Sequence, residues 1–246
     1  MKNDLKYLEE FKKVLENYHI SDNEKAALNS VELVLMASPS AVGRNTVISK
    51  LIKTGNYHFI VSDTTRLPRT NNGVKEVNGS EYWFISEEEF LNGLKENRYL
   101  EAALIHDQQV SGISMKEIDR ASREHKVAIT DIEVQGVETI LSVKPDAHAI
   151  FLLPPSFEEW MKRLSGRGLM SDIEKRRRLN SAIREYDYAV NSNYYTFLIA
   201  ENVEITVENI NKIVNGNSLS KNAQAEGKKL AKELLEQTKK ALAKSN

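Results

Sequence analysis

The sequence predicts an α/β fold built on a doubly wound parallel sheet, with an inserted lobe and an extra helix at each end. Between about residues 31 and 215, short apolar runs alternate with helical patterns, and such alternation is typical of βαβ units. Several of the runs are apolar at consecutive positions, as expected of parallel strands that helices cover on both faces. The segment from about 62 to 112 breaks this rhythm, because it is rich in Thr, Asn and Gly. We therefore expect an inserted lobe there.

The individual elements follow from the same patterns. Apolar runs predict strands at 31–36, 59–61, 82–84, 127–129, 149–153 and 197–199. Helical periodicity predicts helices at 46–54, 115–124, 156–164 and 172–190.

The two ends of the chain differ from this middle zone. Residues 1–30 form a helical extension, and its first helix carries an apolar face of Leu5, Leu8, Phe11, Leu15 and Tyr18. Residues 216–246 read as a polar linker, from Asn217 to Gly227, followed by an amphipathic helix. Both helices need a surface to cover. We expect packing on the body of the protein or on a second subunit, which leaves a homodimer through the terminal helices open; a membrane surface is the alternative.

The composition is that of a soluble globular protein. The 246 residues include 34 Lys+Arg and 35 Asp+Glu, a net charge of −1, which argues against a nucleic-acid binder. The absence of cysteine excludes a disulfide scaffold and thiolate zinc sites. The charged N-terminus is unlike a secretory signal, and the sequence has no apolar run long enough to cross a membrane. We expect a cytoplasmic protein with no membrane or nucleic-acid partner.

The turn after the first predicted strand has the context of a phosphate-binding loop, since a small-residue turn leads from a strand into a helix. Its residues are Ser38, Pro39, Ser40, Ala41, Val42, Gly43, Arg44, Asn45 and Thr46. The glycine-rich template ends in Gly-Lys-Ser/Thr, and only Gly43 matches it outright. An ordinary strand-to-helix turn explains this stretch about as well.

The replacements in this loop change its chemistry. Arg44 stands at the lysine position and offers a planar fork in place of a compact ammonium. Asn45 stands at the position of the Mg²⁺-binding hydroxyl and could offer a carbonyl oxygen. Thr46 has a hydroxyl, but one residue further along a helix it points about 100° away.

A more specific pattern follows the second strand. Residues 62–69 read Ser-Asp-Thr-Thr-Arg-Leu-Pro-Arg, and Gly79 and Tyr82-Trp83-Phe84 come next. This order resembles the nucleoside-monophosphate lobe of guanylate kinases, Ser-x-Thr-Thr-Arg-x-x-Arg and then Gly-x-x-Tyr-x-Phe. Further segments resemble the same family in the same order: 99–103, 130–136, 150–156 and 163–179. The resemblance covers about residues 31–202 and neither terminal helix.

The resemblance implies a set of site residues. At the monophosphate site it implies Ser62, Arg66, Arg69, Tyr82, Glu101, Ser114, Asp131 and Glu133. The first four would hold the GMP phosphate, because guanidinium forks match phosphate oxygens in pairs. Glu101 and Glu133 would read the N–H donors of guanine, which adenine lacks.

The resemblance also implies the ATP side of the site. Arg44, Arg167 and Arg178 would be catalytic, the last two on a helical lid over 162–178. Asp131 would face Mg²⁺ through water, Asn45 would be a weaker metal ligand, and Asn202 would touch adenine. The lobe would span 62–115 within a kinase domain of 31–215.

The expected function is transfer of the γ-phosphoryl group of ATP, with Mg²⁺, to GMP and dGMP. Two departures from the family keep alternatives open. Glu133 stands where the family has Asp, and the 106–112 segment lacks the family's phosphate-binding tyrosine. One alternative is a catalytically impaired module that binds a nucleotide or a protein partner. The other is a kinase for a different monophosphate.

Overall fold

In the computed structural model, the described residues are 5–71, 73–105, 107–166 and 171–244. They form two compact units, which are treated separately below. The first unit comprises residues 1–32, 58–128 and 139–145; the second comprises 33–57, 129–138 and 146–246.

A five-stranded sheet in the order β11-β10-β1-β9-β2 forms the core of the fold. Its strands are β1 (Leu33–Ala37), β2 (Tyr57–Phe59), β9 (Val127–Asp131), β10 (His148–Leu153) and β11 (Thr196–Ile199). β1 pairs with β10, and β10 with β11, in parallel. All five residues of β1 are buried, because helices cover both faces of a parallel sheet. The predicted α/β fold with a central parallel sheet is confirmed.

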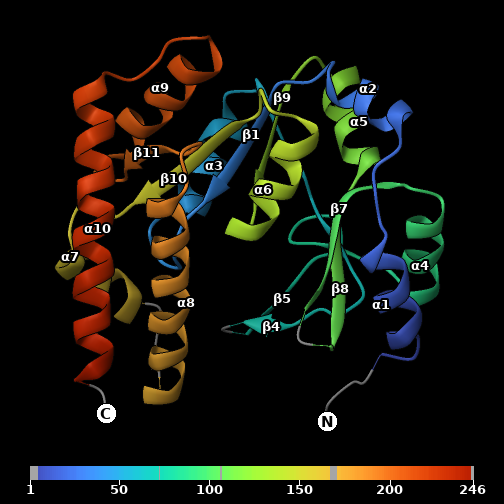
Figure 1. The fold of residues 1–246 in the computed structure, drawn as a ribbon, viewed down its shortest axis with the longest axis horizontal. Coiled ribbons are helices and arrows are strands. Elements are labelled where there is room, and N and C mark those ends of the chain that lie inside the picture. Colours follow the sequence, from blue (N-terminus) through green and yellow to red (C-terminus); the bar gives the residue numbers. More distant parts are fainter. Residues whose placement is uncertain (1–4, 72, 106, 167–170, 245–246) are drawn as a thin grey trace. The chain divides into compact units, whose positions relative to one another are not determined.

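Helices accompany these strands (Figure 1). They are α3 (Arg44–Lys53), α6 (Val134–Val143), α7 (Phe157–Ser165), α8 (Asp172–Asn191), α9 (Val203–Val214) and α10 (Lys221–Ala243). Ser156, Ser171 and Asn202 begin α7, α8 and α9, and each side chain accepts a backbone N–H of the first turn, which satisfies donors that a helix leaves unpaired. Helices α7 and α8 start within one residue of the predicted 156 and 172, whereas α9 was not predicted.

The first unit contains the expected inserted lobe, a four-stranded sheet in the order β6-β3-β8-β7. Its strands are β3 (Asp63–Thr64), β6 (Trp83–Phe84), β7 (Tyr99–Ile105) and β8 (Gln109–Ser114), and a small hairpin of β4 (Thr70–Asn71) and β5 (Val74–Lys75) extends from it. The helices of this unit are α1 (Leu8–Glu16), α2 (Asp22–Leu28), α4 (Glu87–Lys95) and α5 (Met115–Arg123).

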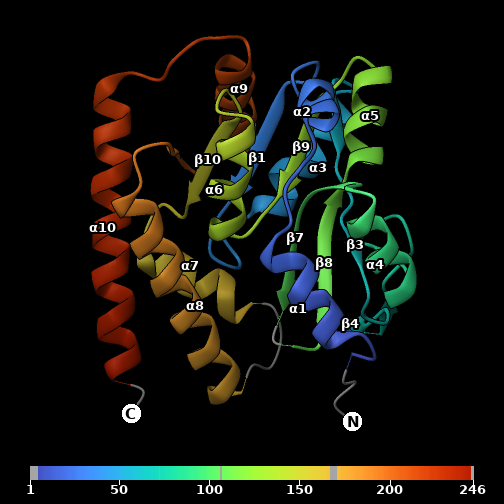
Figure 2. The ribbon, with the colours of Figure 1, turned by 45° about the vertical axis from the view of Figure 1, so that its right-hand side comes forward.

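The N-terminal extension covers the lobe. Phe11 of α1 is fully buried in an apolar cluster with Phe90, Tyr99 and Val110, and Figure 2 shows α1 in front of β7 and β8. The hydroxyl of Tyr18 donates to the carbonyl of Tyr99 (2.6 Å) and accepts its N–H (2.9 Å). Tyr18 therefore pairs both backbone groups of a residue on β7, the edge strand.

The C-terminal extension covers an edge of the five-stranded sheet. Helix α10 runs beside α8 and over β11 (Figure 1). The side-chain amide of Gln224 accepts the N–H of Phe197 (3.0 Å) and donates to its carbonyl (3.3 Å). Phe197 lies on β11, which is also an edge strand.

The predicted linker from Asn217 to Gly227 is wrong in extent. Helix α10 begins at Lys221, after Ser220, whose side chain accepts the N–H of Ala223. Gly227 lies inside the helix. The position requires glycine because the helix approaches Phe197 closely there: an added Cβ would stand 2.6 Å from the Cβ of Phe197. No helix in the described part of the chain is both long and apolar enough to cross a membrane.

Candidate active site

The loop between β1 and α3 is the predicted phosphate loop, residues 38–46. Gly43 is the N-cap of α3 and adopts φ 117°, a left-handed value that glycine tolerates. Ala41 also has a positive φ, 68°, although it carries a side chain. The start of α3 leaves its first backbone N–H groups without helical partners, and such groups favour an anion.

Helix α7 holds this loop through two side chains. The indole Nε1 of Trp160, which is fully buried, donates to the carbonyl of Ser40 (2.8 Å). Nη1 of Arg163 donates to the carbonyl of Val42 (2.9 Å). These contacts fix two carbonyls of the loop. Sequence reasoning did not assign either residue to the site, although the lid motif includes Arg163.

Arg44 and Asp131 come together in the second unit. Nη2 of Arg44, in the first turn of α3, lies 3.1 Å from Oδ2 of Asp131, at the end of β9. Nε of Arg44 is buried without a hydrogen-bond partner. The residue expected to bind ATP phosphates is thus paired with the carboxylate expected to face Mg²⁺.

Glu185 of α8 also belongs to this neighbourhood, and sequence reasoning missed it. Its Oε2 is buried without a hydrogen-bond partner. Burial, and next the negative charge of Glu133, raise the pKa of Glu185 to about 7, while the positive charge of Arg44 opposes the rise. A polar residue on a long charged helix gave no sequence signal that its carboxyl would be buried.

The remaining ATP-side predictions are placed as follows. Nε of Arg178 pairs with Oε1 of Glu174 one turn earlier on α8 (2.8 Å). Asn202 is the N-cap of α9, and its Oδ1 accepts the N–H of Ile205 (3.0 Å). Arg167 lies outside the described residues. Asn45 and Thr46 are exposed at the start of α3.

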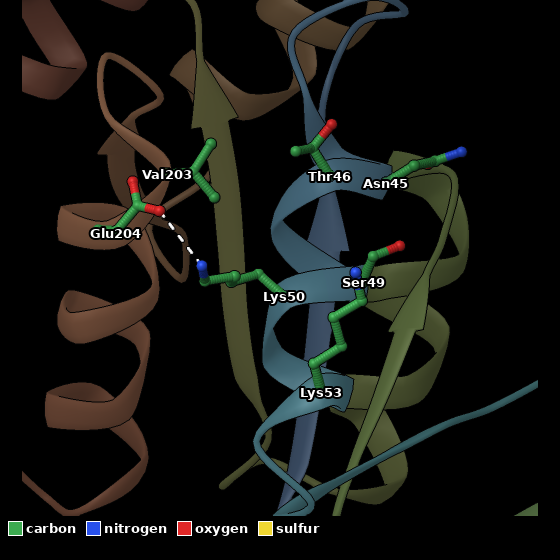
Figure 3. A pocket seen from close by; sticks show the side chains of 7 residues that line it. All are labelled: Asn45, Thr46, Ser49, Lys50, Lys53, Val203 and Glu204. Atoms are coloured by element: carbon green, nitrogen blue, oxygen red, sulfur yellow. Dashed lines mark hydrogen bonds and ion pairs between the residues drawn. The ribbon is translucent and has the colours of Figure 1, made fainter.

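Two cavities flank the phosphate loop within the second unit. One, of about 390 Å³, is lined by Val42, Gly43, Arg163, Glu201 and other residues of the loop, α7 and α9. The other, of about 500 Å³, lies between α3 and α9. Figure 3 shows Lys50 reaching across this second cavity to Glu204 at 3.3 Å, with Asn45 and Thr46 at its upper rim.

The residues predicted to hold the GMP phosphate, Ser62, Arg66, Arg69 and Tyr82, are called the monophosphate clamp here. The guanidinium of Arg66 lies 4.7 Å from the ring centre of Tyr82. The carbonyl of Ser62 accepts the N–H of Trp83, next to Tyr82 (2.9 Å). Arg69 is exposed. All four belong to the first unit.

Two half-buried carboxyl groups lie on the lobe's strands. Burial raises the pKa of Glu101, on β7, to about 7, and among the described residues none donates a hydrogen bond to its side chain. Burial also raises the pKa of Asp63 to about 6, although the hydroxyl of Tyr99 donates to its Oδ2 (2.9 Å). A carboxyl group in the position of Glu101 is suited to a ligand that brings its own N–H donors.

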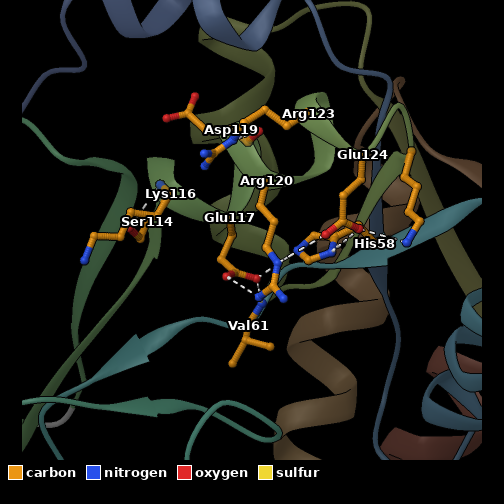
Figure 4. A network of polar contacts seen from close by, with 10 residues as sticks. His58, Val61, Ser114, Lys116, Glu117, Asp119, Arg120, Arg123 and Glu124 are labelled. Atoms are coloured by element: carbon orange, nitrogen blue, oxygen red, sulfur yellow. Dashed lines mark hydrogen bonds and ion pairs between the residues drawn. The ribbon is translucent and has the colours of Figure 1, made fainter.

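Helix α5 fixes the segment that leads to the clamp. Glu117 is 5% exposed, and its Oε2 accepts the N–H of Val61 (3.3 Å) and pairs with Nε2 of His58 (3.0 Å) (Figure 4). Val61 directly precedes Ser62. Ser114, predicted to contact guanine, is buried and is the N-cap of the same helix.

Residues 109–112, part of the segment that departs from the family pattern, lie on β8 in the hairpin of β7 and β8. Ser111 stands just before Gly112, and its hydroxyl donates to that of Thr64 (2.7 Å). A Cβ on Gly112 would lie 2.6 Å from the carbonyl oxygen of Glu101, so only glycine allows this approach. Strand β8, Gln109–Ser114, contains no tyrosine.

The residues present fit a Mg²⁺ ion that ATP brings with it. No group of three acidic or histidine side chains in the described part of the chain could hold a metal ion alone. Asp131 offers one carboxylate, and Mg²⁺ commonly combines one or two protein carboxylates with water and substrate phosphates.

Comparisons with known proteins agree with this arrangement. The guanylate kinase family model matches residues 30–217. The chain is 36% identical over 186 residues to the guanylate kinase of Corynebacterium glutamicum, an alignment that covers 75% of this chain and 95% of that protein. It is 34% identical over 185 residues to guanylate kinase 1 of Oryza sativa subsp. japonica, covering 74% of this chain and 47% of the rice protein, so it spans about half the length of that relative.

A solved structure is similar as well. The crystal structure of guanylate kinase from Anaplasma phagocytophilum superimposes with a TM-score of 0.55 at 25% identity, covering 78% of this chain and 88% of that one. The family model spans most of the chain, and the bacterial relatives match along nearly their whole length. The chain is therefore an enzyme of the guanylate kinase family.

Proposed function

We propose that this protein transfers the γ-phosphoryl group of ATP to GMP, and to dGMP, giving GDP or dGDP and ADP. The observation that carries the proposal is the monophosphate clamp, in which Arg66 lies against Tyr82. In the same unit, the half-buried carboxyl group of Glu101 has no donor of its own among the described residues. Clamp arginines suit a phosphate, and Glu101 suits the N1–H and N2–H₂ donors of guanine.

The proposed chemistry needs little acid–base help. The attacking group is a phosphate oxygen of GMP that is already ionised at neutral pH, so no general base has to be found. Catalysis then consists of in-line positioning and of neutralising charge on the transferring group. Arg44, Arg167 and Arg178 are the cations proposed for this role.

Mg²⁺ would supply charge neutralisation between the phosphates of ATP. Asp131 would hold it through water, and Asn45 is a weaker candidate ligand. Asn202 is proposed to contact adenine through the part of its amide that does not cap α9. With ATP and GMP as substrates, the proposed location is the cytoplasm.

A second candidate function is a guanylate-kinase-like module that binds GMP or a protein partner without turnover. The observation in its favour is that Arg44 is paired with Asp131 in the loop where the template has lysine. A kinase for another monophosphate is a third candidate, because the hairpin of β7 and β8 lacks the tyrosine.

A coupled assay of ADP release with Mg-ATP tests these functions directly. GMP, dGMP, AMP, UMP and CMP would be compared at saturating concentration, with calorimetric titration of GMP in parallel. Turnover confined to GMP and dGMP supports the proposal. Turnover with another monophosphate would contradict the guanine roles of Glu101 and Glu133. Binding of GMP without turnover of any monophosphate would identify a binding module.

A further inference from the structure

We propose that Glu76 is a positioning residue of the monophosphate clamp, which holds Arg66 and the backbone of Arg69 in the geometry that receives the substrate phosphate. This inference rests on the proposed function. Glu76 follows the hairpin of β4 and β5 and belongs to none of the motifs that pointed to the site.

Glu76 contacts both clamp arginines. Its Oε2 accepts from Nη1 of Arg66 (2.5 Å) and its Oε1 from Nη2 (2.9 Å), a paired contact between two planar groups. Oε2 also accepts the backbone N–H of Arg69 (2.7 Å). The side chains of Arg66 and Glu76 are each only 10% exposed, so the pair is shielded from water.

The backbone of Glu76 is fixed too. Its N–H donates to the carbonyl of Arg69 (2.9 Å), beside the hairpin register that pairs Thr70 with Lys75. The hydrogen bond to Arg66 lowers the pKa of Glu76, which keeps the carboxylate ionised at neutral pH. Glu76 is thus held through both its side chain and its main chain.

The contact leaves one edge of the guanidinium for the substrate. A guanidinium has five N–H donors in a fixed fork. Glu76 takes one from each Nη, and the carbonyl of Leu67 takes another from Nη1 (3.1 Å). The side chain of Tyr82 also makes a hydrogen bond with Arg66. Tyr82 and the substrate phosphate would therefore share the donors that Glu76 and Leu67 leave, which are Nε and the second proton of Nη2. The rings of Tyr82 and Phe84, 4.7 and 5.4 Å from the guanidinium carbon, limit its tilt.

The competing interpretation is that Glu76 occupies the place of the substrate phosphate and must be displaced. Three donors and the hairpin backbone hold Glu76, and displacing it would break its paired contact with a guanidinium that is only 10% exposed, which is costly. The two interpretations predict opposite changes in affinity for GMP when the charge of Glu76 is removed.

The test compares Glu76→Gln and Glu76→Asp with the wild type by calorimetric titration of GMP and of guanosine, which lacks the phosphate. In Glu76→Gln an amide N–H₂ would face the N–H groups of Arg66 or of Arg69. We expect GMP binding to weaken on the order of 10-fold or more, as for other partners that orient a ligand-binding residue. Guanosine affinity should change less than about 2-fold, and KM for GMP should rise while kcat and KM for ATP stay near wild type.

The control is Glu96→Gln, which breaks the Glu96–Arg98 pair in the same unit (3.0 Å) and should leave all these values unchanged. Tighter GMP binding by Glu76→Gln would overturn the inference in favour of a displaced placeholder. Equal loss of GMP and guanosine affinity, or no loss, would overturn it as well. If Glu76→Gln does not fold, Glu76→Asp, which keeps the charge but shortens the reach, must show the same selective loss.

These outcomes are separate from failure of the proposed function. A wild-type protein that binds GMP, with Glu76→Gln binding it equally well, would remove only the role of Glu76. A wild-type protein that binds no GMP would overturn both proposals.

Discussion

Arg66 of the monophosphate clamp and Arg44 of the phosphate loop each pair with a carboxylate, but the two carboxylates have different expected roles. Arg66 is held by Glu76, on the edge of the guanidinium away from the proposed substrate. Arg44 is held by Asp131, which is itself expected to face Mg²⁺. On the proposed function, the clamp is organised before substrate arrives, whereas Arg44 would have to share or leave Asp131 to reach the phosphates of ATP.

The surroundings of the two arginines differ in the same way. Arg66 lies against two aromatic rings. Arg44 has a buried Nε without a partner, and the loop before it contains Ala41 at a positive φ. The phosphate loop and the start of α3, whose residues depart from the template, thus contain a buried nitrogen without a partner and a non-glycine residue at positive φ.

The largest expected effect is at Arg44. Arg44→Ala should lose about 2–4 kcal/mol of transition-state stabilisation, because it removes a preorganised charge from the transferring phosphoryl group. Steady-state kcat/KM with GMP and Mg-ATP measures this loss. Lys232→Ala, which also removes a cation but at an exposed position on α10, is the control and should be near wild type. An unchanged rate for Arg44→Ala would show that the loop arginine has no catalytic part.

The next effect tests whether guanine recognition extends to the region of Arg44. Glu133→Ala should raise KM for GMP about 10-fold or more, since a site that loses its acceptor leaves guanine N–H donors unpaired. KM for ATP should barely change, and Glu158→Ala, an exposed change on α7, should alter neither value. Equal rises in both KM values would contradict the guanine role of Glu133.

The smallest effect is a pH dependence at Glu101. Because guanine donors favour the ionised carboxylate, GMP binding should release a proton, and affinity should rise about 10-fold between pH 6 and pH 8 if the pKa of free Glu101 is about 7. Glu101→Gln should remove this rise while leaving the ionisation of the GMP phosphate in place. A profile identical in wild type and Glu101→Gln would assign it to the phosphate alone.

The same shift has a consequence for stability. The pKa of Glu101 is raised in the folded protein, so the folded state holds the proton more tightly than the unfolded state. Its contribution to stability is present below about pH 4.5 and is lost as the pH rises through about 7. Thermal melts across this range, with and without Glu101→Gln, measure that loss.

The sequence predicted the parts of the fold that depend on local pattern. Consecutive apolar residues identified β1 and β10, and helical periodicity identified α7 and α8, because both patterns arise from the burial of neighbouring residues. The motifs pointed to the clamp residues of the first unit and, separately, to Arg44 and Asp131 of the second unit, but not to the pairing of these two. Their assignment to substrates remains a prediction.

The sequence could not predict features that depend on distant partners. Gly227 looks like the end of a linker, and only its approach to Phe197 explains a glycine inside α10. Trp160, Glu76 and Glu185 are ordinary residues in the sequence, and their importance arises from the carbonyl, the guanidinium or the buried space that the fold brings to them.

The two terminal extensions determine how long a recombinant fragment of this chain must be. Unpaired strand edges can recruit strands from other molecules and seed insoluble assemblies. Tyr18 and Gln224 lie outside the 30–217 match, and each hydrogen-bonds the backbone N–H and carbonyl of one edge-strand residue. A recombinant fragment trimmed to the family boundaries would lose both terminal helices and expose the apolar surfaces that they cover. A fragment for expression should therefore extend beyond the family boundaries at both ends.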